Sequence, residues 1–332
     1  MKERIYNSII KYDLIKSGDK LVLAVSGGPD SLFMLDILNK IKNDENINLN
    51  FEIVVAHVNH MIRDEANSEE EFVKEFCKKI NVECYTKRID VKNYANNKKV
   101  GTEEAGRTLR YEFFEEVMKK TNSNKIAIAH NKNDKVETII MNLLRGSGTT
   151  GLRGIEPKRD NKYIRPIIEI ERYEIENYCK ENNLNPCIDK TNFENIYTRN
   201  KVRNIVIPYI KEEFNPNIIK TLTRLSDLVT EEDEFLVKLT KEIYQKILID
   251  VEKNTIILNL REFNKQENVI KKRLILYTVT ELCGTTKGLE KIHIEDIIKL
   301  CSNNIGNKFL TPNKNLKVLV KEQKIFFQNL KK

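Results

Sequence analysis

The feature that most constrains the fold is an alternation of short apolar runs with longer amphipathic segments over residues 20–144. The runs have strand length, and the segments after them carry apolar residues at helical spacing. Predicted strands are 20–25, 51–57, 83–89 and 125–130, and predicted helices are 31–41, 68–80, 103–119 and 135–144. This alternation predicts an α/β fold with a mostly parallel, doubly wound sheet. Because ligands bind at the carboxyl ends of such strands, we expect the chemistry near Ser26, His57 and His130.

The chain after residue 144 has a different pattern, which is mostly helical. We predict a sheet domain, a long linker helix and a smaller, mainly helical C-terminal domain, with bounds 1–214, 215–249 and 250–332. The linker has Pro216 in its first turn and apolar residues at helical spacing. Short strands in the last domain are predicted at 255–260, 317–320 and 324–327.

Composition narrows the class of protein. The net charge of +8 suits an anionic partner such as RNA. The alternative is that Lys is the default cation of this sequence, as in the featureless stretch 92–99. The six cysteines are never spaced as a redox, zinc or iron-sulfur pair, so we expect reduced thiols, mostly in the core. Residues 1–16 carry scattered charges and no apolar run has membrane-spanning length, so we expect a soluble, cytoplasmic protein.

The sharpest local motif is Ser-Gly-Gly-Pro-Asp-Ser at positions 26–31, between the first predicted strand and its helix. Two glycines let the backbone approach a phosphate, and the helix N-terminus offers free N–H groups. Ser26 and Ser31 can donate hydrogen bonds, and Asp30 can bind magnesium or its waters. The loop lacks the lysine of a Walker A loop and the spacing of a dinucleotide fingerprint. The alternative is a plain strand-to-helix turn with Asp30 or Ser31 as the cap.

Two further motifs combine cations with a strand or helix end. His57 and His60 lie at the end of the second predicted strand, where histidines are either structural or ligand-binding. Arg107 and Arg110 stand three positions apart on one helix face and can hold a triphosphate or RNA phosphates. The alternative for the arginines is a solvated helix with ion pairs to the preceding glutamates.

Acidic residues follow the fourth predicted strand. His130 ends the strand, and Asp134 and Glu137 lie on one side of the next helix. Carboxylates there can bind magnesium, or can hold an incoming ammonium group and help to remove its proton. Proton removal matters for a primary amine with a pKa of about 10.4, which is unreactive while charged. The alternative is that these charges only complement the helix dipole.

Arginines mark the last two motifs. The glycine-dense segment 145–154 carries Arg145 and Arg153, and it either closes over a nucleotide or base or is an ordinary mobile loop. Arg199 and Arg203 stand four positions apart on a predicted helix, as contacts to RNA phosphates require. The same group includes Arg165, Arg172 and residues 189–192.

The order and spacing of these motifs together resemble the tRNA(Ile)-lysidine synthetases, a family of the ATP pyrophosphatase (PP-loop) superfamily. The resemblance runs from about Leu21 to Pro208 and is looser beyond. The 26–31 loop resembles the pyrophosphate-binding loop of that superfamily. The resemblance implies an adenine nucleotide alpha hydrolase-like fold for the sheet domain. It also implies tRNA recognition by the C-terminal domain, for which Lys308, Lys314, Lys317 and Lys321 are candidates.

In that family ATP adenylates the C2 oxygen of the wobble cytidine of tRNA(Ile) with a CAU anticodon, and the ε-amine of free lysine then displaces AMP to give lysidine. The resemblance implies a ligase that forms a carbon–nitrogen bond and uses ATP and Mg²⁺. Catalytic roles are expected for Asp30, Arg110, Asp134 and Glu137. ATP binding is expected from Ser26, Gly27, Gly28, Pro29, Asp30, Ser31, His57, Arg107 and His130. Contacts to tRNA are expected from Arg145, Arg153, Arg199 and Arg203, and magnesium ligation from Asp30 and Asp134.

The sequence departs from the family pattern at two positions. Asn133 stands where an acidic residue often precedes Asp134, which leaves one carboxylate fewer for a metal, and Gly106 replaces a usual alanine. The C-terminal region is short, so we expect it to resemble members without an additional terminal domain. A homodimer is one option for the oligomeric state. Other interpretations are another PP-loop tRNA-modifying enzyme, although thiolation would need paired cysteines, a small-molecule synthetase of that superfamily, and a non-catalytic RNA-binding protein.

Overall fold

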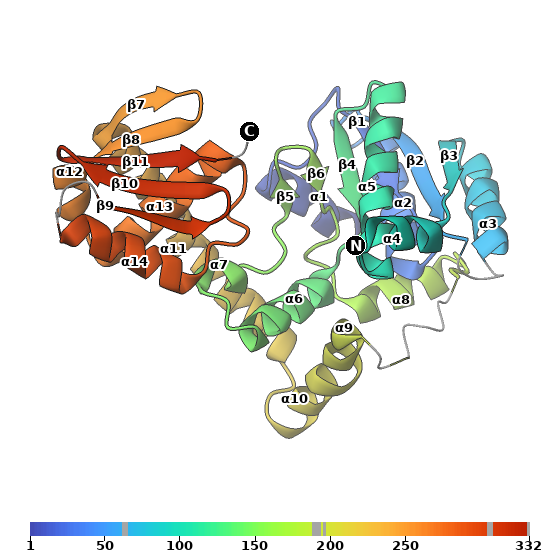
Figure 1. The fold of residues 1–332 in the computed structure, drawn as a ribbon. Helices are drawn as coiled ribbons and strands as arrows, with labels where there is room; N and C mark the ends of the chain where they lie inside the picture. Colours follow the sequence, from blue (N-terminus) through green and yellow to red (C-terminus); the bar gives the residue numbers. More distant parts are fainter. Residues whose placement is uncertain (62–65, 188–193, 195–196, 304–307, 331–332) are drawn as a thin grey trace. The chain divides into compact units, whose positions relative to one another are not determined.

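A computed structural model of the chain describes residues 1–61, 66–187, 194, 197–303 and 308–330 (Figure 1). The chain forms two compact units, Met1–Asp227 and Leu228–Lys332. Within the described ranges, no helix is both long enough and apolar enough to cross a membrane.

The first unit is built on a six-stranded sheet with the strand order β3-β2-β1-β4-β6-β5. The strands are β1 Lys20–Ala24, β2 Glu52–Asn59, β3 Glu83–Arg88, β4 Lys125–Ile128, β5 Lys158–Arg159 and β6 Tyr163–Ile164. Neighbouring strands are parallel except for β5 and β6, so the predicted parallel sheet is confirmed. Because β1 lies between β2 and β4, the loops that follow these three strands meet at one edge of the sheet (Figure 1).

Helices cover both faces of this sheet. The helices are α1 Lys2–Lys11, α2 Pro29–Lys42, α3 Ala66–Lys79, α4 Val91–Lys98, α5 Thr102–Lys120 and α8 Arg172–Glu181. Leu21 and Leu23 of β1 are fully buried in a core shared with α1, α2, α3 and α8. Val22, between them, is buried on the opposite face with Phe113 of α5. Burial on both faces explains why β1 is a continuous apolar run, and it confirms the doubly wound arrangement.

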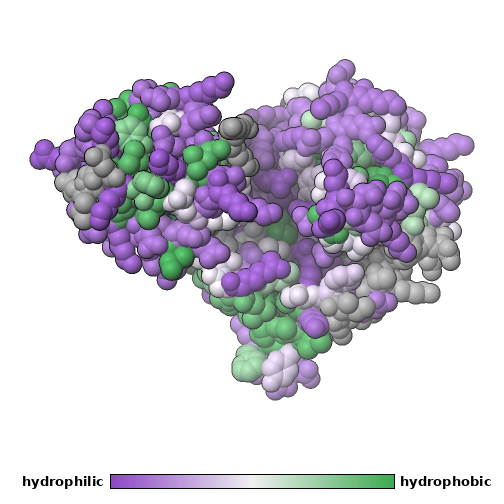
Figure 2. Space-filling model, in the orientation of Figure 1, coloured by the Kyte–Doolittle hydropathy of each residue, from purple (hydrophilic) through white to green (hydrophobic). Residues whose placement is uncertain are grey.

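Shorter helices of the first unit follow β4. They are α6 Lys132–Leu144, α7 Thr149–Leu152, α9 Thr198–Lys201, the π-helical turn η2 Val202–Val206 and α10 Ile207–Glu213. Val136 of α6 packs with Val202 and with Ile219, which lies at the start of α11 (Ile218–Ile247). The segment after residue 197 therefore packs against α6, the helix that follows β4. Figure 2 shows mainly hydrophilic residues over α5 and apolar residues gathered over α6 and α10.

The second unit combines helices with a five-stranded antiparallel sheet of order β7-β8-β11-β10-β9. The strands are β7 Leu248–Glu252, β8 Thr255–Asn259, β9 Lys308–Asn313, β10 Leu316–Lys321 and β11 Lys324–Asn329. The helices are the last part of α11, α12 Leu260–Asn264, α13 Asn268–Cys283 and α14 Lys291–Ser302. Leu274 of α13 is fully buried with Leu258 and Phe327 of the sheet.

The second unit contains helices, as expected, but its five-stranded sheet is larger than the three predicted strands indicated. All residues of β7 after Leu248 are exposed, so β7 lacks the alternation of a half-buried strand. β9 contains Pro312, which argues against a strand in sequence but is tolerated at the edge of a sheet. The long helix α11 ends at Ile247, where β7 takes over. Pro216 lies before α11, so its expected place in the first turn was wrong.

Candidate active site

The loop between β1 and α2 is folded by hydrogen bonds among its own residues. Gly27 has a φ of +91°, a conformation that favours glycine. The Ser31 hydroxyl donates to the Gly28 carbonyl oxygen (2.9 Å) and accepts from the Ser26 backbone N–H (3.1 Å). Helix α2 begins at Pro29 without a hydrogen-bonded capping side chain in the described part of the chain. The N–H groups of its first turn therefore remain available to an anion.

Asp30 lies in the first turn of α2 and is oriented by two side chains. Its Oδ1 accepts a hydrogen bond from Asn131 Nδ2 (2.8 Å), and its Oδ2 lies 3.5 Å from Arg172 Nη2. The pKa of Asp30 is raised: burial raises it most, Arg172 opposes this, and the Asp134 carboxylate raises it further. Two acidic groups that disfavour each other's charge therefore share this space.

Asn131 connects these two acidic residues. While its side chain donates to Asp30, its backbone N–H donates to Asp134 Oδ2 (3.0 Å), and its Oδ1 accepts from the Asp134 backbone N–H (3.0 Å). This reciprocal pair is a capping box at the start of α6. Among the described residues, no group of three or more His, Cys, Asp or Glu side chains is arranged to hold a metal. Two carboxylates such as Asp30 and Asp134 are enough for Mg²⁺, which commonly takes one or two carboxylates together with phosphate and water oxygens.

A buried carboxylate cluster lies beside this pair. Glu137 is 1% exposed and accepts from Arg203 Nε (2.6 Å), Arg203 Nη2 (2.9 Å) and Arg199 Nε (3.0 Å). Arg203 Nη2 also donates to Asp134 Oδ1 (3.0 Å). The pKa of Arg203 is raised, since the bond to Glu137 and the nearby carboxylates outweigh the lowering by burial. Both arginines pair with the carboxylates, and their predicted contacts with RNA phosphates stay predictions.

His130 is surrounded by arginines. Its Nδ1 accepts from Arg165 Nε (3.1 Å), so the neutral ring carries its proton on Nε2. Burial lowers the pKa of His130 to about 3, and the arginines 165, 199, 107 and 110 lower it further. His130 is thus a neutral hydrogen-bond donor in a strongly cationic environment, which suits an anionic ligand.

Two other predicted residues have different surroundings. His57 is 2% exposed and donates from Nδ1 to the Val25 carbonyl oxygen (2.9 Å), so it supports the backbone just before the loop. Burial lowers the pKa of His57. Arg110 donates from Nε to the Gly106 carbonyl oxygen (3.3 Å), and its pKa is lowered by desolvation and by Arg107. A direct contact of His57 with ATP stays a prediction.

Comparisons with known proteins agree with this arrangement. Residues 1–210 match the PP-loop domain family. The tRNA(Ile)-lysidine synthase of Clostridium acetobutylicum is 46% identical over 93% of this chain and 66% of its own length. That of Clostridioides difficile is 42% identical over 98% of this chain and 70% of its own length. The chain belongs to the tRNA(Ile)-lysidine synthase family.

The matched relatives are longer, and this chain spans about two thirds of their length. Among solved structures, the U34-tRNA thiolase NcsA of Methanococcus maripaludis is similar, with a TM-score of 0.56 and 19% identity. The match covers 69% of this chain and 78% of the thiolase. This likeness concerns the fold alone.

The glycine-dense segment 145–154 is more ordered than the sequence indicated. It contains the short helix α7 and is anchored at its end, since a Cβ on Gly154 would lie 2.8 Å from Ile139 Cγ1. The Arg153 carbonyl oxygen accepts from Ser226 Oγ (2.8 Å), and its side chain pairs with Glu156. Arg145 is exposed. Contacts of both arginines with tRNA stay predictions for this member of the lysidine synthase family.

The two departures from the family pattern have local explanations. Asn133 Oδ1 accepts from the backbone N–H of Arg172 (3.0 Å), so the amide binds the start of α8 instead of contributing a carboxylate. A Cβ on Gly106 would lie 3.6 Å from Val91 Cγ1, an ordinary van der Waals contact. An alanine therefore fits at position 106. Residues 189–192 lie outside the described part of the chain.

Sequence reasoning missed Asn131 and gave Arg165 no specific role. Asn131 was detectable in principle, because Asn followed three positions later by Asp is a capping-box pattern. The bond of Arg165 to His130 joins residues 35 positions apart and has no local signal.

Proposed function

We propose that this chain transfers lysine to the wobble cytidine of tRNA(Ile) with a CAU anticodon. In the first step the C2 oxygen of cytidine attacks the α-phosphate of ATP, and pyrophosphate leaves. In the second step the deprotonated ε-amine of L-lysine attacks C2, and the bond from C2 to the oxygen of AMP breaks. The supporting observation is that Asn131 links Asp30 of the phosphate-type loop to Asp134 of the buried carboxylate cluster.

The loop and the arginines suit the nucleotide. The first-turn N–H groups of α2 and the Ser26 hydroxyl suit a pyrophosphate, and the Ser31 hydroxyl holds the loop through its bond to the Gly28 carbonyl oxygen. Arg107 and Arg110 add positive charge near His130, whose Nε2–H can donate to a phosphate or ribose oxygen. Preorganised donors of this kind stabilise the charge that develops on a leaving pyrophosphate.

Asp30 and Asp134 are the residues that would hold Mg²⁺. When bound, the ion would offset negative charge on the phosphates. Asn131 keeps both carboxylates oriented toward the same space.

Glu137 and Asp134 suit the lysine ε-ammonium group. A carboxylate has about four lone-pair sites, and the two arginines donate three hydrogen bonds to Glu137. By this count one lone-pair site remains on Glu137, which is almost fully buried, and two remain on Asp134, which accepts from Asn131 and Arg203. We assign to this pair the binding of the ammonium and the removal of its proton, because the charged amine is not a nucleophile.

The test is tRNA-dependent AMP release with ATP, Mg²⁺ and labelled lysine, comparing tRNA(Ile)(CAU) with tRNA(Met)(CAU). Label in the isoleucine tRNA alone is the expected result. AMP release without lysine incorporation would favour another PP-loop tRNA-modifying enzyme. Binding of tRNA without ATP turnover would favour a non-catalytic RNA-binding protein.

A further inference from the structure

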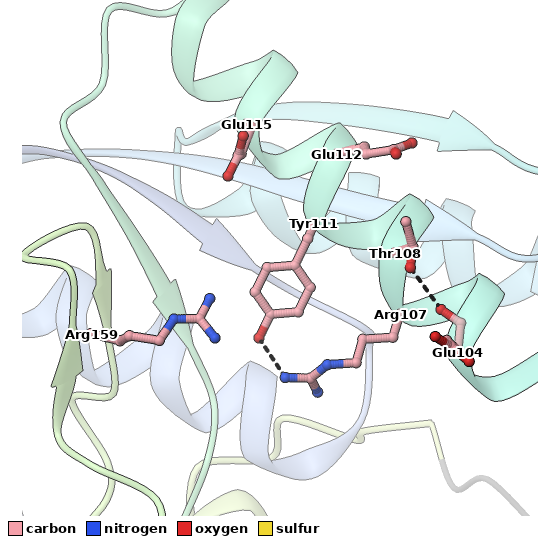
Figure 3. Close-up of a pocket in the computed structure, with 7 residues that line it drawn as sticks. All are labelled: Glu104, Arg107, Thr108, Tyr111, Glu112, Glu115 and Arg159. Atoms are coloured by element: carbon pink, nitrogen blue, oxygen red, sulfur yellow. Dashed lines mark hydrogen bonds between the residues drawn. The ribbon is translucent and has the colours of Figure 1, made fainter. Parts of the chain in front are cut away.

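A pocket on α5 contains residues that, apart from Arg107, have no role in the proposed chemistry. It has a volume of about 410 Å³ and lies on α5 beside the hairpin of β5 and β6 (Figure 3). Its lining residues are Glu104, Arg107, Thr108, Tyr111, Glu112, Glu115 and Arg159. Arg107 lines the pocket, and its charge is also among those that lower the pKa of His130 after burial and Arg165.

The pocket presents flat, delocalised groups. The guanidinium carbon of Arg107 lies 5.0 Å from the centroid of the Tyr111 ring, and that of Arg159 lies 5.6 Å from the same centroid. Figure 3 shows the two guanidinium groups on either side of the tyrosine ring. Arginine planes and aromatic rings are the surfaces on which proteins stack the unpaired bases of RNA.

Arg159 is held in position before any ligand binds. Its guanidinium carbon lies 4.4 Å from the centroid of Tyr163, whose ring packs against Tyr111 with centroids 5.3 Å apart. The Tyr163 hydroxyl in turn donates to Glu115. The acidic partner of Arg159 is Asp160, at 3.5 Å and with a 75% exposed side chain, which makes a weak ion pair. The ring contacts therefore position the Arg159 side chain, and its weak ion pair leaves the guanidinium group able to bind a ligand.

The carboxylates in the lining indicate what kind of ligand fits. Glu115 already accepts hydrogen bonds from Lys162 and Tyr163, but Glu104 and Glu112 are exposed. Carboxylates repel a bare phosphate, whereas the N–H groups on the edge of a base donate to them. A free aliphatic amino acid such as lysine would match the mixed charges but offers no flat face to the stacked groups. A nucleobase satisfies both features.

We propose that this pocket binds the base of a tRNA nucleotide next to the wobble cytidine, stacked against Arg159 and Tyr111 with its edge toward Glu104 or Glu112. The inference rests on the proposed function, because a cytidine reacting in the candidate active site brings its neighbours to α5. A base presented to an active site must leave its stack, which costs stacking energy. Stacking of the neighbouring base in this pocket would recover part of that cost and fix the strand.

The test measures the affinity of the chain for full-length tRNA(Ile)(CAU) over a series of salt concentrations. Arg159→Ala is expected to raise Kd roughly tenfold at every salt concentration, the loss typical of one stacked base. Arg159→Lys keeps the charge but not the plane, so its loss should be nearly as large. Lys158→Ala, on the same hairpin but outside the pocket lining, should change Kd less than twofold. Rescue by lysine together with a reduced salt slope would reveal a phosphate contact and overturn the proposal.

Abasic tRNAs locate the bound nucleotide. Removal of the base on one side of the wobble cytidine should weaken wild-type binding roughly tenfold and should not weaken Arg159→Ala further. Additive losses at both neighbouring positions, or a raised KM for lysine with unchanged tRNA affinity, would overturn the proposal. Lysine incorporation by the wild type tests the proposed function independently of the pocket. If the protein shows this binding pattern but transfers no lysine, the proposed function is contradicted and the proposal for the pocket is not.

Discussion

The two halves of the candidate active site are built in opposite ways. The loop after β1 closes through hydrogen bonds between Ser26, Gly28 and Ser31, which are at most five positions apart. The carboxylate cluster closes through bonds from Glu137 to Arg199 and Arg203, which lie 62 and 66 positions away. The loop is thus a property of one short segment, and the cluster is a property of the folded unit. Apart from Gly27, whose positive φ favours glycine, substitutions in the loop should change the chemistry alone. Substitutions in the cluster should change chemistry and stability together.

The largest effect is expected at Asp30. Asp30→Ala removes the carboxylate that faces Asp134 across Asn131, together with a proposed magnesium ligand. We expect tRNA-dependent AMP release to fall by roughly a thousandfold or more, as for the loss of an essential charge-stabilising group. Urea unfolding should show little loss of stability, since the pKa of Asp30 is raised in the folded protein and its charge is therefore not stabilising there.

Asp36→Asn on the same helix is the matched control. Asp36 accepts from the Tyr178 hydroxyl (2.7 Å) and pairs with Lys40, outside the site. This variant should retain AMP release and lose stability instead. If both variants behave alike, the distinction between loop chemistry and helix packing fails.

The next largest effect is expected at Arg203. Arg203→Ala leaves the buried Glu137 with Arg199 as its remaining cation among the contacts described. We expect the free energy of unfolding to fall by about 2–3 kcal/mol, because a buried carboxylate loses part of its compensation. The KM for lysine should also change, whereas the salt slope of tRNA binding should not.

Arg145→Ala is the control for Arg203→Ala, and both variants are compared in stability and in the salt slope of tRNA binding. Arg145 is exposed and is a predicted tRNA contact, so its loss should leave stability unchanged and reduce the salt slope by about 1. A reduced salt slope for Arg203→Ala with normal stability would support the prediction that Arg203 contacts a phosphate.

The same contrast explains what the sequence could and could not predict. The parallel sheet and the loop follow from patterns within a few residues, namely the apolar run of β1 and the glycines before α2. Arg199 and Arg203 were recognised as unusual, but their partners were not, because a spacing of four positions says nothing about a carboxylate more than 60 positions away. The strand β9 was missed for a related reason: Pro312 opposes a strand locally, and only its place at the sheet edge makes it acceptable.

A smaller effect is expected from His130, which accepts a hydrogen bond from Arg165. The pKa of His130 is lowered to about 3 in the folded protein, by burial first and then by the surrounding arginines. Between its ordinary value of about 6.5 and pH 3, the unfolded chain binds a proton that the folded chain does not, so stability falls as the pH falls. From pH 6.5 to 5.5 the wild type should lose about 1 kcal/mol more than His130→Gln, measured by urea unfolding at both values. Equal losses would mean that His130 titrates normally.

The smallest effect distinguishes a glycine that the structure requires from one that it only tolerates. Gly106 lies inside α5, where an added Cβ meets Val91 and His60 at ordinary contact distances of 3.6 and 3.8 Å. Gly106→Ala should stabilise the protein by about 0.5–1 kcal/mol, because alanine loses less backbone entropy in a helix, and AMP release should be unchanged. Gly27→Ala should have the opposite sign, since Gly27 has a φ of +91° in the loop. Urea unfolding of both variants tests this, and destabilisation by Gly106→Ala would show that α5 packs more tightly against α4 than these distances indicate.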